Sequence, residues 1–519
     1  MGKVSITFED AVTFVGNGKF HFYLLFATGF CLLGANMEGL NMAFVLPAAK
    51  CDIQMTTTEQ GLINAIAFIG FVLTSQLWGF VVDTYGRLKV LQFSLLSGFI
   101  FSIISSFSVS SMMLLFTRLL VGMCTSGSQA SAITYLSEFH SNANRAQSLT
   151  FASMFLPMSI LYQPLLGLAI MTTEFRLSLF GFIYTPWRLY ILVSSLINVV
   201  AFLMLLYTPE SPKFLLAMGE PDKSLKILAR VYEINGYGEK ENFPVKEISQ
   251  DTIGSNLATA RGVKDVLKMI WKQTTPLFRT PFLGSMLMLS YISFVVYAVA
   301  NGVYMWYPQM LELYYENFNS PITMCEAIDL ASTSSEINKL IVLYVNQWTF
   351  MEYFNFRTDV STSTICKINS NPMTFQVIII LGSTFLILYC FVALNLKRIQ
   401  TKVLYTVWLF ISFLATIGNI FGNEFYLNTF LMIVMLSCVN CGNILCAVAS
   451  DLFPTHYKGM ALSLIIMFAR LGAVTGGNVV GALLFKQCNA IFYSIAAILL
   501  IATGISYIIM TKVDSIMAR

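Results

Sequence analysis

The chain has 519 residues, of which 11% are charged and 56% are hydrophobic, and its mean hydropathy is +0.70. Soluble proteins carry about a quarter charged residues, so this composition excludes a water-soluble protein and indicates a chain embedded in lipid. The formal net charge is only +4, and no nucleic-acid partner is expected.

Apolar segments long enough to span a bilayer recur along the whole chain. A helix needs about 20 apolar residues to cross a hydrocarbon core that is ~30 Å thick. The alternating pattern typical of membrane β-strands is absent from the sequence. We therefore predict an all-α membrane protein with twelve transmembrane helices in two six-helix, pseudo-symmetric halves. The expected helices are 20–46, 60–82, 90–108, 112–136, 147–172, 187–207, 282–307, 373–395, 402–421, 424–450, 459–484 and 489–511.

A long polar segment separates the first six spans from the last six. We expect a short N-terminal segment, an N-terminal half, a linker, a C-terminal half that contains a long loop, and a short tail. In that order, the ranges are 1–19, 20–207, 208–280, 281–511 with the loop at 308–372, and 512–519. Most of the 31 Lys and Arg residues fall on the side of both termini, an excess that is typical of cytosolic segments. Both termini and the linker are therefore expected in the cytosol.

The long loop is expected on the opposite side of the membrane. Its residues Cys325 and Cys366 are candidates for a disulfide, because disulfides persist in oxidising compartments. No Cys/His cluster has the spacing of a metal site, so neither a metal nor a cofactor is expected.

Glu38 lies inside the first span, where an ionisable side chain is costly and usually faces the bundle interior. Helical rise places it roughly 14 Å below the outer end of its helix, and Arg118 roughly 10 Å below the same side. Arg470 lies roughly 18 Å from the cytosolic end and is the alternative partner. A pair with Arg118 would keep Glu38 ionised, whereas an unpaired Glu38 would take up protons. Two hypotheses follow: proton or substrate coupling, and a structural ion pair.

The connection between the second and third spans carries Gly79, Asp83, Gly86 and Arg87. Glycines permit a tight turn and close backbone approach, and the acid can pair across helices. A plain basic turn would not need an acid at the membrane edge. The segment resembles the signature of the major facilitator superfamily between helices 2 and 3.

Two pairs of opposite charge recur at the ends of two long spans. Glu138 and Arg145 are separated by the same interval as Asp451 and Lys458, which indicates duplication of one membrane unit. Transporters place their substrate path at the interface of such repeats. For any one of these residues a solvated charge at a helix end is the simpler interpretation.

With Glu210, which follows the sixth span, these pairs resemble the sugar-porter branch of the superfamily. The resemblance implies that such acids and bases bridge the two halves on the cytosolic side when the carrier faces outward. The predicted cytosolic gate comprises Gly79, Asp83, Gly86, Arg87, Glu138, Arg145, Glu210, Asp451 and Lys458.

Other stretches are similar to the synaptic vesicle glycoprotein 2 family and related organic-solute carriers. They are 8–20 before and into the first span, 44–49 at its end, and 451–454 after the tenth. The resemblance covers all twelve spans and is weakest in the loop 308–372. It implies the major facilitator fold, in which helices 1, 4, 7 and 10 line the cavity. The long N-terminal region of the synaptic proteins is missing, so their ligands and partners are not transferred.

Polar and aromatic side chains on these helices and on helix 5 are candidate contacts for a solute. Each one alone is more typical of a helix–helix hydrogen bond or an interfacial aromatic than of a solute contact. The predicted substrate-binding or coupling residues are Glu38, Arg118, Asn36, Asn41, Tyr162, Gln163, Asn301, Tyr304, Trp306, Asn440, Asn443 and Arg470.

These features favour a secondary transporter of a small organic solute that works by alternating access, with a proton as the candidate coupling ion. It is expected as a multi-pass protein of the plasma membrane or of an intracellular vesicle membrane. The alternative is a non-transporting, transporter-like protein with a regulatory or vesicle-trafficking role. An enzyme is not expected, since the sequence shows no nucleophile–base pair and no phosphate loop.

Overall fold

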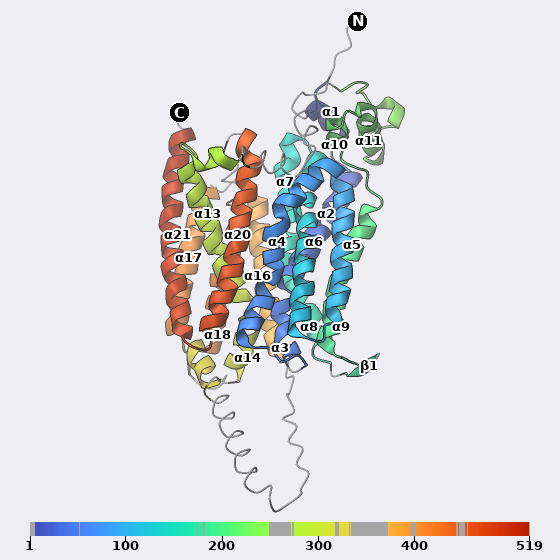
Figure 1. Cartoon of the computed structure of the whole chain (residues 1–519). Coiled ribbons are helices and arrows are strands. Elements are labelled where there is room, and N and C mark those ends of the chain that lie inside the picture. Colours follow the sequence, from blue (N-terminus) through green and yellow to red (C-terminus); the bar gives the residue numbers. More distant parts are fainter. Residues whose placement is uncertain are drawn as a thin grey trace, which may run out of the picture.

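Long helices that run side by side make up most of the computed structural model (Figure 1). The structure describes residues 6–50, 52–173, 175–179, 182–248, 271, 274–316, 321–331, 333, 372–395, 401–442, 445, 452–453 and 455–517. The N- and C-terminal ends lie at one end of the bundle, here called the terminal face (Figure 1). The opposite end, the loop face, carries α3 (Met42–Ala49), α14 (Tyr307–Tyr315) and β1 (Leu177–Leu179).

Ten helical segments of the described chain are long and apolar enough to cross a membrane. They are Lys19–Ala49, Thr58–Tyr85, Arg87–Ser106, Gln147–Ile170, Pro186–Leu205, Leu283–Tyr304, Pro372–Val392, Val403–Phe421, Met460–Leu483 and Cys488–Ile508. The fourth expected span coincides with the long helix α6 (Ser111–Glu138), which does not meet the same criteria. The tenth coincides with the shorter apolar helix Phe425–Asn440. The all-α membrane fold is thus confirmed, and twelve crossings stay a prediction.

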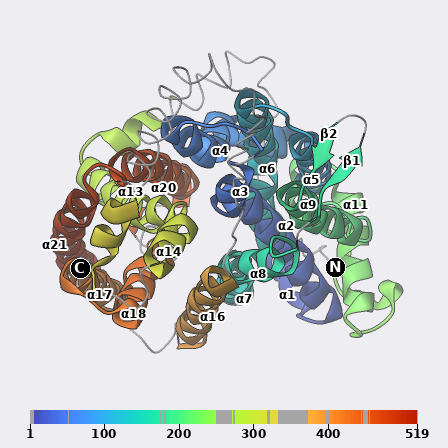
Figure 2. The ribbon, with the colours of Figure 1, turned by 90° about the horizontal axis from the view of Figure 1, so that it is seen from below.

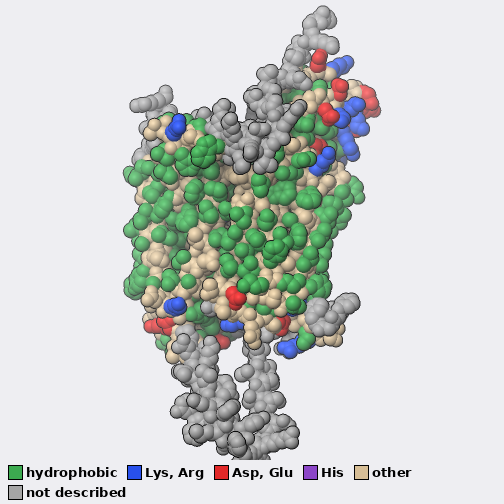
Figure 3. Space-filling model, viewed as in Figure 1, with side chains coloured by type: hydrophobic (Ala, Val, Ile, Leu, Met, Phe, Trp, Pro, Cys, Tyr) green, Lys and Arg blue, Asp and Glu red, His purple; other side chains and the backbone are tan. Residues whose placement is uncertain are grey.

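Hydrophobic side chains cover the middle of the molecule on the face that Figure 3 shows, and charged side chains gather toward its two ends. Large apolar side chains such as Leu73, Phe93 and Leu203 are more than half exposed on the helices. Exposed apolar surface of this extent needs a lipid environment. This exposed apolar surface around the middle of the molecule, here called the apolar belt, supports the membrane assignment independently of helix length.

The N-terminal half runs from α2 (Lys19–Leu40) to α9 (Pro186–Leu205). After α3 its other helices are α4 (Thr57–Tyr85), α5 (Arg87–Ser106), α6, α7 (Asn142–Ser153) and α8 (Phe155–Ile170). A short antiparallel hairpin of β1 and β2 (Phe182–Tyr184) precedes α9. Local chemistry explains how α4 begins: Thr56 and Glu59 cap its free N–H groups reciprocally.

The C-terminal half begins at η3 (Thr275–Phe278) and α13 (Leu283–Tyr304), and α14 follows α13 directly. Its remaining elements are α16 (Pro372–Asn395), α17 (Thr401–Phe421), α18 (Phe425–Leu436), η4 (Ser437–Asn440), α20 (Thr455–Leu483) and α21 (Cys488–Met517). The last helix therefore continues past residue 511, where the sequence predicted its end.

The two halves meet along two seams, α4 against α20 and α8 against α16 (Figure 2). A Cβ atom on Gly382 of α16 would lie 2.6 Å from the Cα of Leu161 on α8. Small residues let helix backbones approach this closely. Near the loop face, Asn64 of α4 donates a hydrogen bond of 2.8 Å to the carbonyl of Met305. Glycine packing and isolated polar contacts therefore join the halves.

A small cap lies on the terminal face beside the N-terminal half (Figure 1). It consists of α1 (Phe8–Val15), α10 (Pro212–Ala217), α11 (Pro221–Ile234) and η1 (Lys240–Asn242). Phe8 and Val12 of α1 and Leu228 and Val231 of α11 belong to one buried apolar cluster. The N-terminal segment and the linker thus fold together, and we call this unit the terminal cap.

Candidate functional site

Glu38 lies near the end of α2 and is almost completely buried, with 1% of its surface exposed. Its Oε2 accepts hydrogen bonds from Arg118 Nη1 at 2.9 Å, Ser102 Oγ at 2.8 Å and Asn41 Nδ2 at 3.2 Å. Its Oε1 accepts one from Asn198 Nδ2 at 3.2 Å. All of these partners belong to the N-terminal half. A buried carboxylate is tolerated only when it is paired and hydrogen-bonded in this way.

Arg118 of α6 is the basic partner of Glu38 and has no exposed surface. Its Nε donates to Ser105 Oγ at 2.7 Å. Its Nη2 is buried without a hydrogen-bond partner among the described residues. The alternative pairing of Glu38 with Arg470 is therefore wrong, because Arg118 approaches Glu38 from the neighbouring helix α6.

Arg470 lies on α20 in the opposite half and reaches across the seam. Its Nη2 donates to Gln129 Oε1 on α6, and its guanidinium carbon lies 5.0 Å from the ring centre of Phe71 on α4. It forms none of the ion pairs between described residues. These two contacts are with neutral groups of the N-terminal half.

Several predicted contact residues join helices to one another. Asn36 donates to Ser159 Oγ at 2.6 Å, and Gln163 donates to the carbonyl of Met37 at 3.0 Å, so both connect α2 with α8. Asn41 belongs to the Glu38 network. Trp306 donates to the carbonyl of Gly477 on α20 at 2.8 Å. These side chains therefore have structural partners in this conformation.

The remaining predicted contact residues have fewer partners. Tyr304 Oη and Asn440 Nδ2 are buried without a hydrogen bond to any described residue, and Asn301 is also buried. Tyr162 packs against a small apolar cluster of α2 and α8. Asn443 lies outside the described residues.

Phe44 of α3 is an aromatic residue that is not among the predicted contact residues. Its ring stacks on that of Phe375 of α16, with centres 6.0 Å apart. The rings of Tyr190 and Tyr304 lie 6.2 Å and 6.4 Å away. Because Phe375 and Tyr304 belong to the C-terminal half, this aromatic cluster joins the halves toward the loop face.

Four of the predicted gate residues, Asp83, Arg87, Glu138 and Glu210, form a connected network on the terminal face of the N-terminal half. Arg87 pairs with Asp83 at 2.9 Å and with Glu138 at 3.1 Å. Glu210 Oε1 accepts the backbone N–H groups of Arg87, Leu88 and Ser211 at 2.9 to 3.0 Å. The start of a helix favours a nearby carboxylate, because the first N–H groups of the helix have no hydrogen-bond partner within it. Glu210 thus caps the start of α5.

Gly86 supplies the turn that this cap requires. Its φ angle is +102°, a conformation that residues with a Cβ rarely adopt, and an added Cβ would lie 2.5 Å from Glu210 Oε2. Gly79, by contrast, has open space around the position of a Cβ. The structure therefore gives Gly86 a steric role and gives Gly79 none.

The predicted contacts between the two acid–base pairs are not seen among the described residues. Arg145 pairs with Glu9 of the terminal cap at 2.7 Å, and Glu138 pairs with Arg87. Asp451 lies outside the described residues, and the side chain of Lys458 is not described. The bridging of the halves by these residues stays a prediction.

Sequence reasoning missed Ser102, Ser105 and Asn198, which complete the Glu38 network. Two serines one helical turn apart and an asparagine within otherwise apolar spans were the available signal. It also missed Glu9, whose role depends on the fold of the terminal cap.

A family comparison agrees with this architecture. The model of the Major Facilitator Superfamily matches residues 24–334, which is more than half of the chain. The chain belongs to the major facilitator superfamily.

Its curated relatives within the superfamily include synaptic vesicle proteins. Human synaptic vesicle glycoprotein 2B is 26% identical over 331 residues, 59% of this chain and 47% of the relative. Human synaptic vesicle glycoprotein 2A is 30% identical over 231 residues, 44% of this chain and 31% of the relative. The matched region thus spans less than half of the length of each relative, 47% of glycoprotein 2B and 31% of glycoprotein 2A.

Solved structures of the superfamily share the fold. The partially occluded, inward-open xylose transporter XylE from E. coli is 11% identical with a TM-score of 0.63, covering 94% of this chain and 99% of that one. A bacterial homologue of the human lysosomal transporter Spinster, inward-facing and unoccupied, is 11% identical with a TM-score of 0.58, covering 95% and 98%. These likenesses support the superfamily fold.

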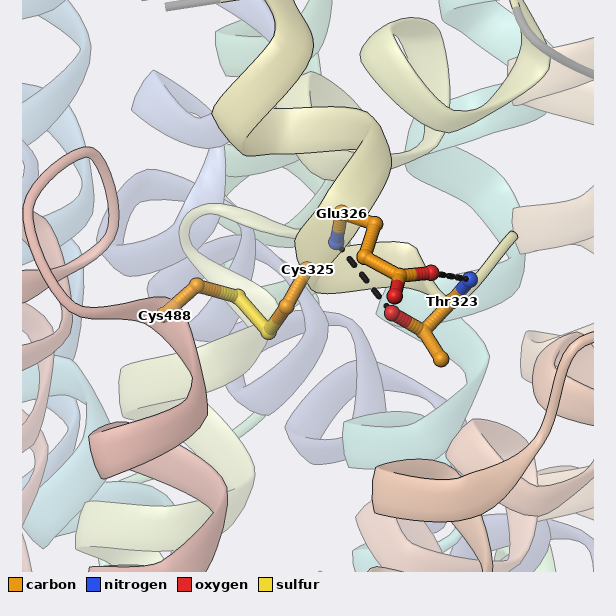
Figure 4. Close-up of a disulfide and its surroundings, with 4 residues drawn as sticks. All are labelled: Thr323, Cys325, Glu326 and Cys488. Carbon is orange, nitrogen blue, oxygen red and sulfur yellow. Dashed lines mark hydrogen bonds between the residues drawn. A yellow bond between two sulfur atoms is a disulfide. The ribbon is translucent and has the colours of Figure 1, made fainter.

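One disulfide on the loop face of this major facilitator protein differs from the sequence-based prediction. Cys325 pairs with Cys488 at the start of α21, with Cα atoms 5.4 Å apart (Figure 4). The candidate pairing of Cys325 with Cys366 is therefore wrong, because the segment around Cys325 lies against the turn before the last helix. Beside it, Thr323 and Glu326 cap the start of a short helix reciprocally. Cys366 lies outside the described residues.

Proposed function

We propose that this major facilitator protein is a secondary transporter that moves a small organic solute by alternating access. The observation that carries the proposal is the way the two helical halves meet. Two seams hold them together through glycine contacts and isolated hydrogen bonds, as between Asn64 and Met305. Such an interface can open at one end while it closes at the other, because few bonds need to break.

The contacts near the loop face support an inward-facing conformation. The cluster around Phe44 and the contact between α3 and α14 join the halves there. At the terminal face, the described charges pair within the N-terminal half and its cap. The structural relatives named above are also described as inward-open or inward-facing. We propose that the solute path is closed at the loop face in this conformation.

Orientation and membrane are part of the proposal. Basic residues concentrate on the terminal face, which favours its placement in the cytosol. The disulfide of Cys325 and Cys488 favours an oxidising environment at the loop face. These two independent features support the same sidedness, with the bilayer around the apolar belt of a plasma or vesicle membrane.

A proton is the proposed coupling ion, and Glu38 is the group that would carry it. Protonation of Glu38 would remove the negative charge that pairs with Arg118 and would weaken the hydrogen bonds that Arg118, Ser102 and Asn41 donate to Oε2. The weakened contacts would then favour another arrangement of α2, α5 and α6. A purely structural ion pair is the competing hypothesis, and variants of Glu38 and Arg118 distinguish the two.

The experiment that tests transport is a solute-uptake screen in sealed vesicles that contain the purified full chain. We expect at least one small organic solute to enter faster than into protein-free vesicles, with saturation at high concentration. A proton gradient should increase that uptake. Failure of every compound in a panel of sugars, amines and carboxylates to enter would contradict the proposal.

The second candidate is a non-transporting membrane protein with a regulatory or vesicle-trafficking role. The curated relatives support it, because they are named for synaptic vesicles. The chain matches about half of the length of synaptic vesicle glycoprotein 2B. An absence of flux in the screen would favour this candidate over transport.

A further inference from the structure

The charged side chains within the predicted spans do not balance. Away from the span ends, the sequence places one acid, Glu38, and two bases, Arg118 and Arg470. Charged groups inside a membrane are costly and are usually paired or placed toward a water-filled path. The count therefore leaves one positive charge that needs a partner.

The structure shows which base is left over. Arg118 lies 2.9 Å from the Glu38 carboxylate, and both side chains are closed off within the N-terminal half. Arg470 contacts the amide oxygen of Gln129 and the ring of Phe71, which carry no charge. Among the described residues, no carboxylate forms an ion pair with Arg470. The described contacts of its charge are therefore with neutral groups.

Arg470 also lies where a solute would pass. It is near the middle of α20, and its two contacts lie on α4 and α6 across the seam. Arg470 and Gln129 both keep partial exposure, whereas Arg118 has none. Their contact joins the two halves, at the boundary along which transporters of this kind place their substrate path.

We infer that Arg470 binds the anionic group of the transported solute and that this solute is a small organic carboxylate. The inference rests on the proposed transport function. A planar guanidinium has five N–H donors that suit a carboxylate, and the hydrogen bond to Gln129 engages Nη2. A carboxylate would supply the negative charge that the protein does not place beside Arg470. Movement of the halves would then change the contacts of Arg470 with Gln129 and with the solute together.

A latch between the halves is the simplest rival role for Arg470. In that role the hydrogen bond to Gln129 matters and the charge of the solute does not. Gln129→Leu removes the neutral contact and keeps the cation, whereas Arg470→Gln removes the cation. The anion site predicts that only Arg470→Gln abolishes the preference for carboxylates, and a latch predicts no change of preference in either variant.

The test measures uptake of acetate, lactate and benzoate, each beside its uncharged amide, with xylose and choline as neutral and cationic probes. We expect uptake of at least one carboxylate to exceed that of its amide. Arg470→Gln should reduce it at least about tenfold, because a charge-assisted contact is lost, and Arg470→Lys should retain part of it. Gln129→Leu should lower uptake and keep the preference.

The outcomes separate this inference from the proposed function. Uptake of xylose or choline alone, or carboxylate uptake that Arg470→Gln leaves unchanged, would overturn the anion site while transport stands. No uptake of any probe would overturn both. Should Arg470→Gln fail to fold, thermal unfolding of the wild-type chain in detergent gives a second test. The carboxylate that is taken up should raise the unfolding midpoint more than its amide does, and equal midpoints would contradict the inference.

Discussion

Glu38 and Arg118 form an ion pair that is closed within one half of the molecule, with 2.9 Å between Oε2 and Nη1. The substitution Glu38→Gln should abolish any pH dependence of uptake while leaving membrane insertion intact, because the amide cannot take up the proton. It should also destabilise the fold by about 3 kcal/mol, because Arg118 then stays buried without a counter-charge. Uptake at several pH values and thermal unfolding in detergent measure the two effects.

The double variant Glu38→Gln/Arg118→Met serves as the control, since it removes both charges. It should recover much of the lost stability, because replacement of a buried ion pair by uncharged groups is often neutral. Under proton coupling its uptake stays independent of pH. A double variant with wild-type pH dependence would show that the pair is structural only.

Glu210 should stabilise the protein through the start of α5. Its Oε1 accepts three backbone N–H groups, those of Arg87, Leu88 and Ser211. Glu210→Ala leaves these donors without that acceptor and should cost about 1–2 kcal/mol of unfolding free energy. Glu210→Gln keeps an oxygen acceptor and should cost less. Equal unfolding midpoints for the Ala and Gln variants would argue against the cap.

The disulfide predicts a specific pair of linked peptides. Digestion of the unreduced protein should give one species that joins the peptides of Cys325 and Cys488, and reduction should separate them. Mass spectrometry reads this directly. A species that joins Cys325 to Cys366 would contradict the structure and restore the pairing expected from the sequence.

Low pH should destabilise the junction between α6 and α7. Burial, together with the nearby His21 ring and Arg145, lowers the pKa of His140 to about 4, and a hydrogen bond to the carbonyl of Leu136 opposes this shift in part. The ring of His21 lies 4.8 Å away, and the guanidinium of Arg145 pairs with Glu9. The unfolded chain binds this proton below about pH 6.5, so stability is lost as pH falls from there toward 4.

Unfolding midpoints measured between pH 7.5 and 4.5 check this prediction. The drop across the window should be smaller in His140→Gln, because its side chain does not titrate. An equally steep drop in both proteins would assign the pH dependence to other groups.

The fold was predictable because span length and the distribution of charge report directly on the bilayer. Depth along the helices also placed Arg118 opposite Glu38, since helical rise is constant. The rotation of each helix about its axis was not predictable from one sequence. Ser102 and Asn198 therefore went unnoticed, although they face Glu38.

The predicted pairing of Cys325 with Cys366 was wrong for a related reason. Cys488 is 163 residues from Cys325 and begins the last helix, which the sequence did not connect with the long loop. Only the packing of the loop face brings the two segments together. The partner of Arg145 was not predictable for the same reason, because only the folding of the terminal cap brings Glu9 next to it.

Exchange of a solute across sealed vesicles is the sharpest test of whether this chain works by alternating access. A solute found in the uptake screen is supplied outside in labelled form, with or without the same unlabelled solute inside. A carrier should take up the label faster when the inside is preloaded, because the loaded return step is available. Label entry at the same rate with and without preload, or no entry of any solute, would rule out alternating-access transport by this chain.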